Sequence, residues 1–182
     1  MSGHSKWSQI KRKKAVTDAK KGQVFSKLSK IIELAAKKGS DPKTNLALKA
    51  AIDQAKMVNM PVANIERAIQ KGSGQLEGSS GLEEVVYEVY GSGGVALLII
   101  GVTSNKNRTV AEIKHILAKH GASLSGAGSV KWLFESKYEA GEIIWLPKQT
   151  IELGATDEKK MEELMEELDE NEDVSEVFTN SS

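Results

Sequence analysis

The basic side chains near the start of the chain are the residues best suited to hold a ligand. Residues 1–21 carry a run of Lys and Arg around Trp7, Ile10 and Val16. Lysines that meet phosphates release counterions and bind without regard to sequence, and a Trp can stack on an unpaired base. The candidate nucleic-acid-binding residues are Lys6, Trp7, Lys11, Arg12, Lys13, Lys14, Lys20, Lys21, Lys27 and Lys30. A solvated tail whose Trp packs on its own domain is the alternative interpretation.

The distribution of charge along the chain favours the first interpretation. The 182 residues include 25 Lys and Arg and 25 Asp and Glu, so the formal net charge is zero. Residues 1–75, however, hold 16 Lys and Arg against 5 Asp and Glu, and residues 76–182 hold 9 against 20. The first part therefore has a formal net charge of +11 and the second a net charge of −11. Such asymmetry favours contact of the basic half with nucleic acid or another anionic surface.

Two further motifs have the right residue types for phosphate binding. Residues 91–96 formally match the glycine pattern of dinucleotide sites, but a strand is expected to follow, so they predict a hairpin turn. Asn107, Arg108 and Thr109 stand where a helix is expected to begin and form a candidate site for an anion. Capping of that helix by Asn107 or Thr109 is the favoured interpretation.

Residue types that carry catalysis or bind metals are scarce. The chain has no Cys, which excludes disulfides, thiol nucleophiles and Cys-ligated metals. His115 and His120 are five residues apart on one expected helix and point in different directions. We therefore expect no metal and no cofactor, and we do not expect an enzyme, since no residue pattern marks a catalytic group.

Neither a membrane span nor a secretion signal is apparent. The longest apolar run, residues 95–102, is far shorter than the roughly 20 residues that a bilayer requires. No apolar signal core follows the basic start. We expect a cytoplasmic protein without a membrane partner, with an organelle as the alternative, because a basic start also resembles a transit peptide.

Hydrophobic periodicity predicts three helices in the basic half. Apolar residues recur at three- and four-residue steps over 24–35, 48–58 and 62–69. Asp41 and Pro42 are expected to begin the second helix, as N-cap and first-turn residue. Residues 22–75 thus form a helical domain, residues 1–21 a flexible basic arm, and the Gly- and Ser-rich residues 76–82 a linker.

The acidic half predicts a sheet domain over residues 83–182. Strands are expected at 85–90, 95–102, 130–135, 142–146 and 174–178, and helices at 110–117 and 161–168. This order gives an α+β fold of ferredoxin-like size with two helices on one face of the sheet. The acidic run 157–173 is interpreted as a solvated helix face. Contact with a basic partner, such as the chain's own N-terminal half, is the alternative.

Several ordered motifs together resemble the YebC/PmpR family, which includes the mitochondrial translational activator of cytochrome c oxidase. They are Gly3-His4-Ser5-Lys6-Trp7, Asp41-Pro42, Asn59-Met60-Pro61, Ile65-Glu66-Arg67-Ala68-Ile69, Lys71-Gly72, Tyr87-Glu88-Val89-Tyr90-Gly91, Gly93-Gly94-Val95-Ala96, Asn107-Arg108-Thr109-Val110-Ala111-Glu112 and Gly128-Ser129-Val130 with Trp132 and Phe134. Residues 146–153 and 177–180 look like the family's C-terminal end. Typical members carry a further α/β segment where only residues 136–141 stand here, so this chain resembles a short form.

The resemblance implies a regulatory factor of gene expression that binds nucleic acid. Members are described as DNA-binding transcriptional regulators or as factors that associate with ribosomes. The first hypothesis is a translation factor that binds rRNA, tRNA or the ribosome, because a flexible basic arm suits irregular RNA better than a DNA major groove. A DNA-binding transcriptional regulator is the second hypothesis. A hydrolase or nuclease is the third, and no residue supplies its catalytic group.

Overall fold

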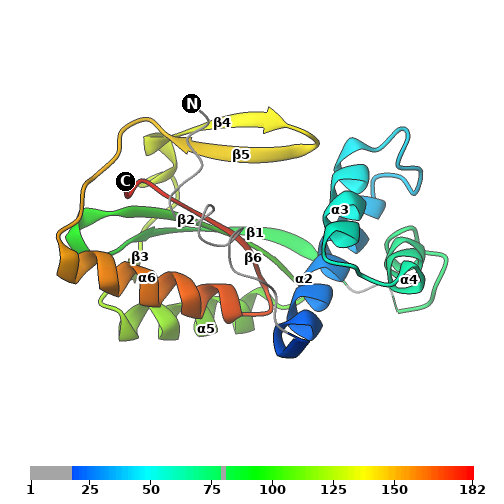
Figure 1. Cartoon of the computed structure of the whole chain (residues 1–182), viewed down its shortest axis with the longest axis horizontal. Coiled ribbons are helices and arrows are strands. Elements are labelled where there is room, and N and C mark those ends of the chain that lie inside the picture. The colour runs from blue at the N-terminus through cyan, green and yellow to red at the C-terminus, as the bar shows by residue number, and fades with distance from the viewer. Residues whose placement is uncertain (1–17, 79–80) are drawn as a thin grey trace.

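A computed structural model describes residues 18–78 and 81–182, and it has an α+β fold (Figure 1). The helical domain consists of α2 (Asp18–Ala36), α3 (Leu46–Met57) and α4 (Val62–Gly72). Their apolar stripes meet in one core that contains Ile32, Leu48 and Ala55, each fully buried. The α+β prediction, with three helices preceding a sheet domain that carries two more, is confirmed.

The helix ends in this domain differ from the expected ones. Residues 18–21, which the sequence pattern places in the arm, form the first turn of α2. The second helix begins at Leu46, so the expectation that Asp41 caps it is wrong. Asp41 instead closes a local turn, in which its carboxylate accepts from the Lys43 N–H at 2.9 Å. Asn45 is the N-cap, and its side-chain oxygen accepts from the Leu48 N–H at 3.1 Å.

The sheet domain is built on four antiparallel strands in the order β3-β1-β2-β6. These are β1 (Glu83–Tyr90), β2 (Ala96–Thr103), β3 (Ser123–Leu124) and β6 (Val174–Thr179). The turn between β1 and β2 includes the short helix η1 (Ser92–Gly94), and Gly93 and Gly94 have φ of 72° and 78°. Because these left-handed angles suit glycine, the glycine motif is a hairpin turn, as predicted.

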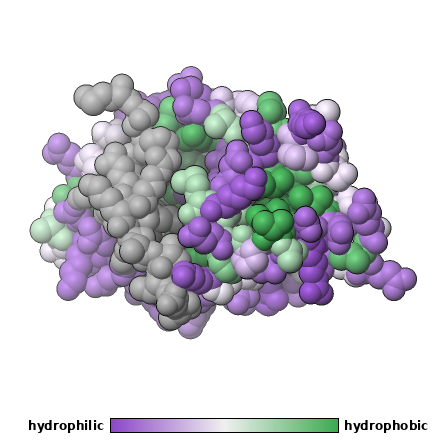
Figure 2. All heavy atoms as spheres, turned by 45° about the vertical axis from the view of Figure 1, so that its right-hand side comes forward, coloured by the Kyte–Doolittle hydropathy of each residue, from purple (hydrophilic) through white to green (hydrophobic). Residues whose placement is uncertain are grey.

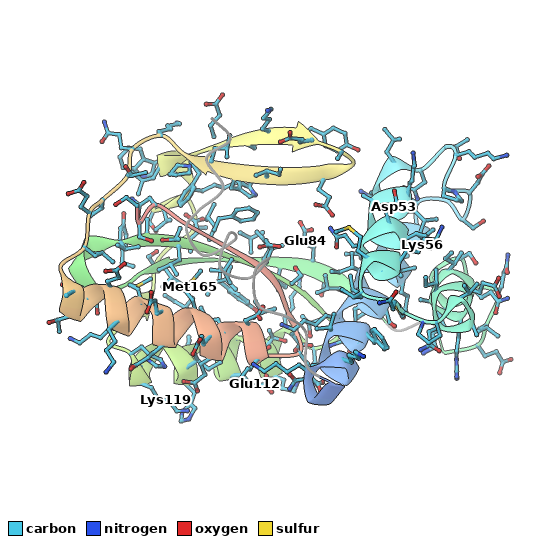
Figure 3. All side chains as sticks on the ribbon, viewed as in Figure 1. Asp53, Lys56, Glu84, Glu112, Lys119 and Met165 are labelled. Carbon is cyan, nitrogen blue, oxygen red and sulfur yellow. The ribbon has the colours of Figure 1, made fainter. Side chains whose placement is uncertain are left out.

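One face of this sheet is covered by α5 (Lys106–Lys119) and α6 (Ala155–Glu170), as Figure 1 shows. Leu97 and Ile99 of the central strand pack there against Ile113 of α5 and Leu164 of α6, and all four are buried. Met165, labelled in Figure 3, lies between α6 and the sheet. Lys119 and His120 at the end of α5 both contact Glu167 of α6, at 2.6 and 2.7 Å.

The opposite face is covered by a separate two-stranded sheet, β4 (Phe134–Glu139) and β5 (Glu142–Pro147) (Figure 1). Phe134 and Trp145 of this hairpin pack on Leu98 and Phe178 of the main sheet. The prediction of a strand over residues 130–135 is wrong before Phe134, because residues 131–133 form the short helix η2 (Lys131–Leu133). The pair β4 and β5 is also not part of the main sheet, and the short strand β3 has no counterpart in the sequence pattern.

Candidate nucleic-acid interface

Most of the arm residues predicted to bind nucleic acid lie outside the described residues. These are Lys6, Trp7, Lys11, Arg12, Lys13 and Lys14. Lys20 and Lys21 follow in the first turn of α2, and both are exposed. The Lys20 ammonium lies 3.6 Å from the carboxylate of Glu170 at the end of α6, and both side chains are more than half exposed. Such a surface pair is weak and competes poorly with a polyanion.

Lys27 and Lys30 lie at the junction between the two domains. Lys27 donates a hydrogen bond to the Asp169 carbonyl, and its ammonium lies 3.7 Å from the Asp169 carboxylate. Lys30 donates to the Asp173 carboxylate at 2.7 Å and to the Glu172 carbonyl at 3.1 Å. The last carbonyls of a helix carry partial negative charge, so cations stabilise that end. These two lysines therefore act as counter-charges to the end of α6.

This junction corrects the interpretation of the acidic run. At its end, Asp169 and Asp173 do not lie on a solvated helix face, because both contact the basic helix α2 and Asp173 is 2% exposed. The alternative, contact with the chain's own basic half, holds for this part of the run. Lys27 and Lys30 are accordingly only 13% and 23% exposed, and both already form ion pairs with the protein's own carboxylates.

Asp173 is the centre of a buried polar cluster that joins three elements. Besides Lys30, its carboxylate accepts from the Arg108 guanidinium at 2.8 Å and from the Thr109 hydroxyl at 2.7 Å. Burial of Asp173 raises its pKa, but the hydrogen bonds from Lys30, Arg108 and Thr109 outweigh this effect and lower the pKa to about 2. The carboxylate is therefore charged in the folded protein at neutral pH.

The same cluster shows what the candidate anion site does in the folded chain. Arg108 is paired with the protein's own carboxylate, and Thr109 is buried between Asp173 and the Thr103 hydroxyl. Asn107 is exposed and lines an open depression along the edge of β1. The expectation that Asn107 or Thr109 caps α5 is wrong, because Asn105 is the N-cap and accepts from the Arg108 N–H at 3.1 Å.

The helical domain exposes other cations that the candidate residues did not include. Within the described parts of the chain, five of its cationic side chains are exposed and have no hydrogen-bond or ion-pair partner: Lys38, Lys43, Lys49, Lys56 and Arg67. Lys56 and Asp53 lie on α3 in Figure 3. Figure 2 brings this domain forward and shows a hydrophobic area among the hydrophilic side chains. The exposed apolar residues of α3 and α4 are Leu46, Met57 and Val62.

The described residues contain neither a metal-binding cluster nor a membrane-spanning helix. Among residues 18–78 and 81–182, no three His, Asp or Glu side chains are arranged to hold a metal ion. No helix in the same part of the chain has both the length and the apolar character needed to cross a bilayer.

The molecule is thus an α+β protein in which a basic three-helix domain packs on an acidic sheet domain through ion pairs at the junction. A family model for the TACO1/YebC protein N-terminal domain matches residues 5–75. A second, for the TACO1/YebC second and third domain, matches residues 82–140 and 135–181. The chain therefore belongs to the TACO1/YebC family.

Curated relatives and a solved structure resemble nearly the whole chain. A "probable transcriptional regulatory protein" of Syntrophus aciditrophicus is 50% identical over 183 residues, covering 100% of this chain and 72% of the relative. One of Thermoanaerobacter pseudethanolicus is 40% identical, covering 99% of this chain and 96% of the relative. The crystal structure of a conserved hypothetical protein from Aquifex aeolicus has a TM-score of 0.86 at 33% identity, and covers 98% of this chain and 97% of that one.

The matches also indicate where this chain is shorter than some relatives. The alignment with the Thermoanaerobacter protein runs over 238 residues, more than the 182 of this chain, so the relative contains additional residues. The model of the second and third domain is matched in two parts, residues 82–140 and 135–181, which overlap across β4. This break in the match lies at the β4–β5 hairpin, where the sequence motifs led us to expect a missing segment.

Proposed function

We propose that this protein is a regulatory factor of gene expression that binds nucleic acid through its N-terminal half, and that its target is RNA on or near the ribosome. One observation carries the proposal: the basic charge is concentrated in residues 1–75, which hold 16 Lys and Arg against 5 Asp and Glu. Part of this charge is neutralised at the domain junction, but the exposed cations of α3 and α4 are not.

The physical basis is electrostatic. Each phosphate that a Lys or Arg neutralises releases counterions, so affinity falls steeply as salt rises. The sheet domain, with 9 Lys and Arg against 20 Asp and Glu over residues 76–182, is repelled by the same polyanion. By net charge, a polyanion therefore attracts the helical domain more strongly than the sheet domain. Binding, not catalysis, is the role we propose, and ribosomes place it in the cytoplasm or an organelle.

The second candidate is a DNA-binding transcriptional regulator. It is favoured by the relatives of Syntrophus and Thermoanaerobacter, each called a "probable transcriptional regulatory protein". This candidate requires a clear ratio of specific over non-specific duplex affinity. Equal affinity for all duplexes would leave RNA as the better target, since irregular RNA is bound largely through shape and phosphates.

Co-sedimentation with ribosomes at rising salt tests the proposal. The intact chain is expected to pellet with ribosomes at low salt and to dissociate as salt increases. Replacement of Lys11, Arg12, Lys13 and Lys14 by Ala should weaken binding and flatten the salt dependence by about 0.7–0.9 per lost phosphate contact. No ribosome-bound fraction at low salt, together with sequence-specific duplex binding, would instead establish the transcriptional alternative.

A further inference from the structure

A large aromatic side chain on the acidic sheet domain is both exposed and held in place. Trp132, in η2, is 63% exposed, although Trp is usually well buried. Its indole N–H donates to the Ser129 carbonyl at 2.9 Å. The hydroxyl of Tyr90, itself 38% exposed, donates to the same carbonyl at 3.0 Å. One carbonyl oxygen thus fixes the polar ends of two aromatic rings whose surfaces remain open.

The loop that carries Ser129 is itself anchored by a buried carboxylate. Glu88 of β1 is 7% exposed and accepts from the N–H groups of Gly128, Val130 and Lys131 at 2.6–2.7 Å. Burial of Glu88 raises its pKa, but these three hydrogen bonds outweigh the effect and the pKa is lowered. Glu88 is therefore ionised and fully used by the loop, and its charge is not directed at a ligand of Trp132.

Two exposed lysines accompany Trp132: Lys131 precedes it in the chain, and Lys148 contacts its main chain. The Lys148 ammonium donates to the Trp132 carbonyl at 2.8 Å, and Lys148 is exposed. Lys131, also exposed, places its ammonium 4.9 Å from the centre of the Trp145 ring. A fixed, solvent-facing aromatic ring suits an unpaired base because the ring stacks on the base, and lysines in the same region can hold its phosphate.

We propose that Trp132, with Lys131 and Lys148, forms a stacking site for an unpaired nucleobase of a single-stranded nucleic acid. This site extends nucleic-acid contact to the acidic domain, beyond the N-terminal surface of the proposed function. It also explains why an exposed Trp is oriented by a hydrogen bond. A rigid aromatic ring loses little conformational freedom on binding, so more of its stacking energy is realised as affinity.

Oligonucleotides with and without bases test the site in the full-length chain. The probes are a fluorescein-labelled oligouridylate dodecamer, the oligothymidylate of the same length and an abasic dodecamer with the same number of phosphates. Trp132→Ala should weaken binding of the base-containing strands about 5- to 150-fold, the range for removal of one stacking aromatic. Affinity for the abasic strand should not change. Trp132→Phe, which keeps a stacking ring, should retain most of the affinity.

Tyr138 provides the matched control. It is an aromatic residue of the neighbouring strand β4 with a similar exposure of 61%, and no side-chain hydrogen bond fixes it in the described structure. Tyr138→Ala should leave all three affinities unchanged. Equal losses in both base-containing strands indicate recognition of the base by stacking. A loss confined to uridylate shows that the 2′-hydroxyl or the missing thymine methyl is also read; both results support the site.

Other outcomes overturn this inference separately from the proposed function. No effect of Trp132→Ala, or an equal loss for the abasic strand, excludes stacking on Trp132. If the Lys11–Lys14 substitutions still weaken all three strands, the proposed function stands without this site. Conversely, if Trp132→Ala weakens binding but the Lys11–Lys14 substitutions do not, the stacking site is supported and the arm is not the nucleic-acid contact.

Discussion

Lys30 of α2 and Asp173 at the start of β6 form a 2.7 Å ion pair that joins the basic domain to the acidic one. The carboxylate is 2% exposed and also receives hydrogen bonds from Arg108 and Thr109. A buried carboxylate with several donors is stabilised only while each donor remains. This pair therefore couples the position of α2 to the packing of α5 and β6.

Asp173→Asn should strongly destabilise the folded chain. The amide retains the shape but removes the charge that balances Lys30, so a partly buried ammonium is left without its counter-ion. We expect a loss of about 3 kcal/mol in the free energy of unfolding by urea. Glu170→Gln is the control, since its pair with Lys20 is more than half exposed on both sides and should contribute less than about 1 kcal/mol. Equal effects of the two substitutions would contradict the special role of Asp173.

The stability of the protein should fall in acid because of the same carboxylate. The folded-state pKa of Asp173 is lowered from 3.8 to about 2, so its stabilisation is present above pH 4 and is lost as the pH falls toward 2. The shift corresponds to about 2 kcal/mol. Unfolding free energies measured at several pH values should show this loss in the natural chain. In Asp173→Asn this contribution should be absent, and a retained acid slope would assign it to other groups.

Glu88→Gln should loosen the loop that carries Trp132. An amide cannot replace a carboxylate that accepts from three backbone N–H groups, so we expect a loss of about 2 kcal/mol in stability. Hydrogen exchange at Gly128, Val130 and Lys131 should accelerate. Glu84→Gln is the matched control, because Glu84 lies on the same strand but is exposed. Unchanged exchange in Glu88→Gln would show that other contacts hold the loop.

Gly141→Ala tests the contact between the hairpin and the helical domain. Gly141 has a φ of 93°, and a Cβ there would lie 2.4 Å from the Leu46 carbonyl oxygen of α3. Gly94→Ala is the control, since Gly94 has a φ of 78° but open space around it. Both variants incur the backbone strain of about 1 kcal/mol, and only Gly141→Ala should lose more in urea unfolding. Equal losses would mean that the hairpin tip can move aside at no cost.

The exposed lysines of α3 should contribute to nucleic-acid binding. Replacing both Lys49 and Lys56 by Gln should lower the salt slope of binding by about 1.4–1.8, if each contacts one phosphate. The matched pair Lys159 and Lys160 is exposed on the acidic helix α6. Their replacement by Gln should leave the slope unchanged. A similar decrease in both double variants would argue for a general effect of net charge.

The helices and the main strands could be predicted because their apolar residues repeat with a local period. Ile32, Leu48 and Ile65 lie in the core of the helical domain, and the glycine turn at Gly93 and Gly94 is where the pattern placed it. Helix starts were less predictable. Asp41 and Asn45 are both capping residue types, and the choice between them depends on Asn45 donating to the Ala35 and Gly39 carbonyls across the turn.

The candidate site was less predictable, because contacts between distant residues decide it. Lys30 has the same residue type as the solvent-exposed lysines, and its carboxylate partner is 143 residues further along the chain. The expected strand at Val130 is interrupted because Glu88, 42 residues earlier, captures the Val130 N–H. A local pattern contains neither fact. The basic charge of the N-terminal half, in contrast, is a property of composition and can be counted directly from the sequence.

The β4–β5 hairpin has a consequence for how members of this family differ in length. Glu139 and Glu142 pair directly across it, so the chain leaves and re-enters the sheet domain at neighbouring points. A segment added there extends a surface loop, which costs little in chain entropy and leaves the registers of both sheets intact. The tip of the hairpin is therefore a position at which a whole segment can be inserted or deleted. Because Gly141 at this tip lies against Leu46 of α3, such an insertion or deletion changes the surface that α3 contacts.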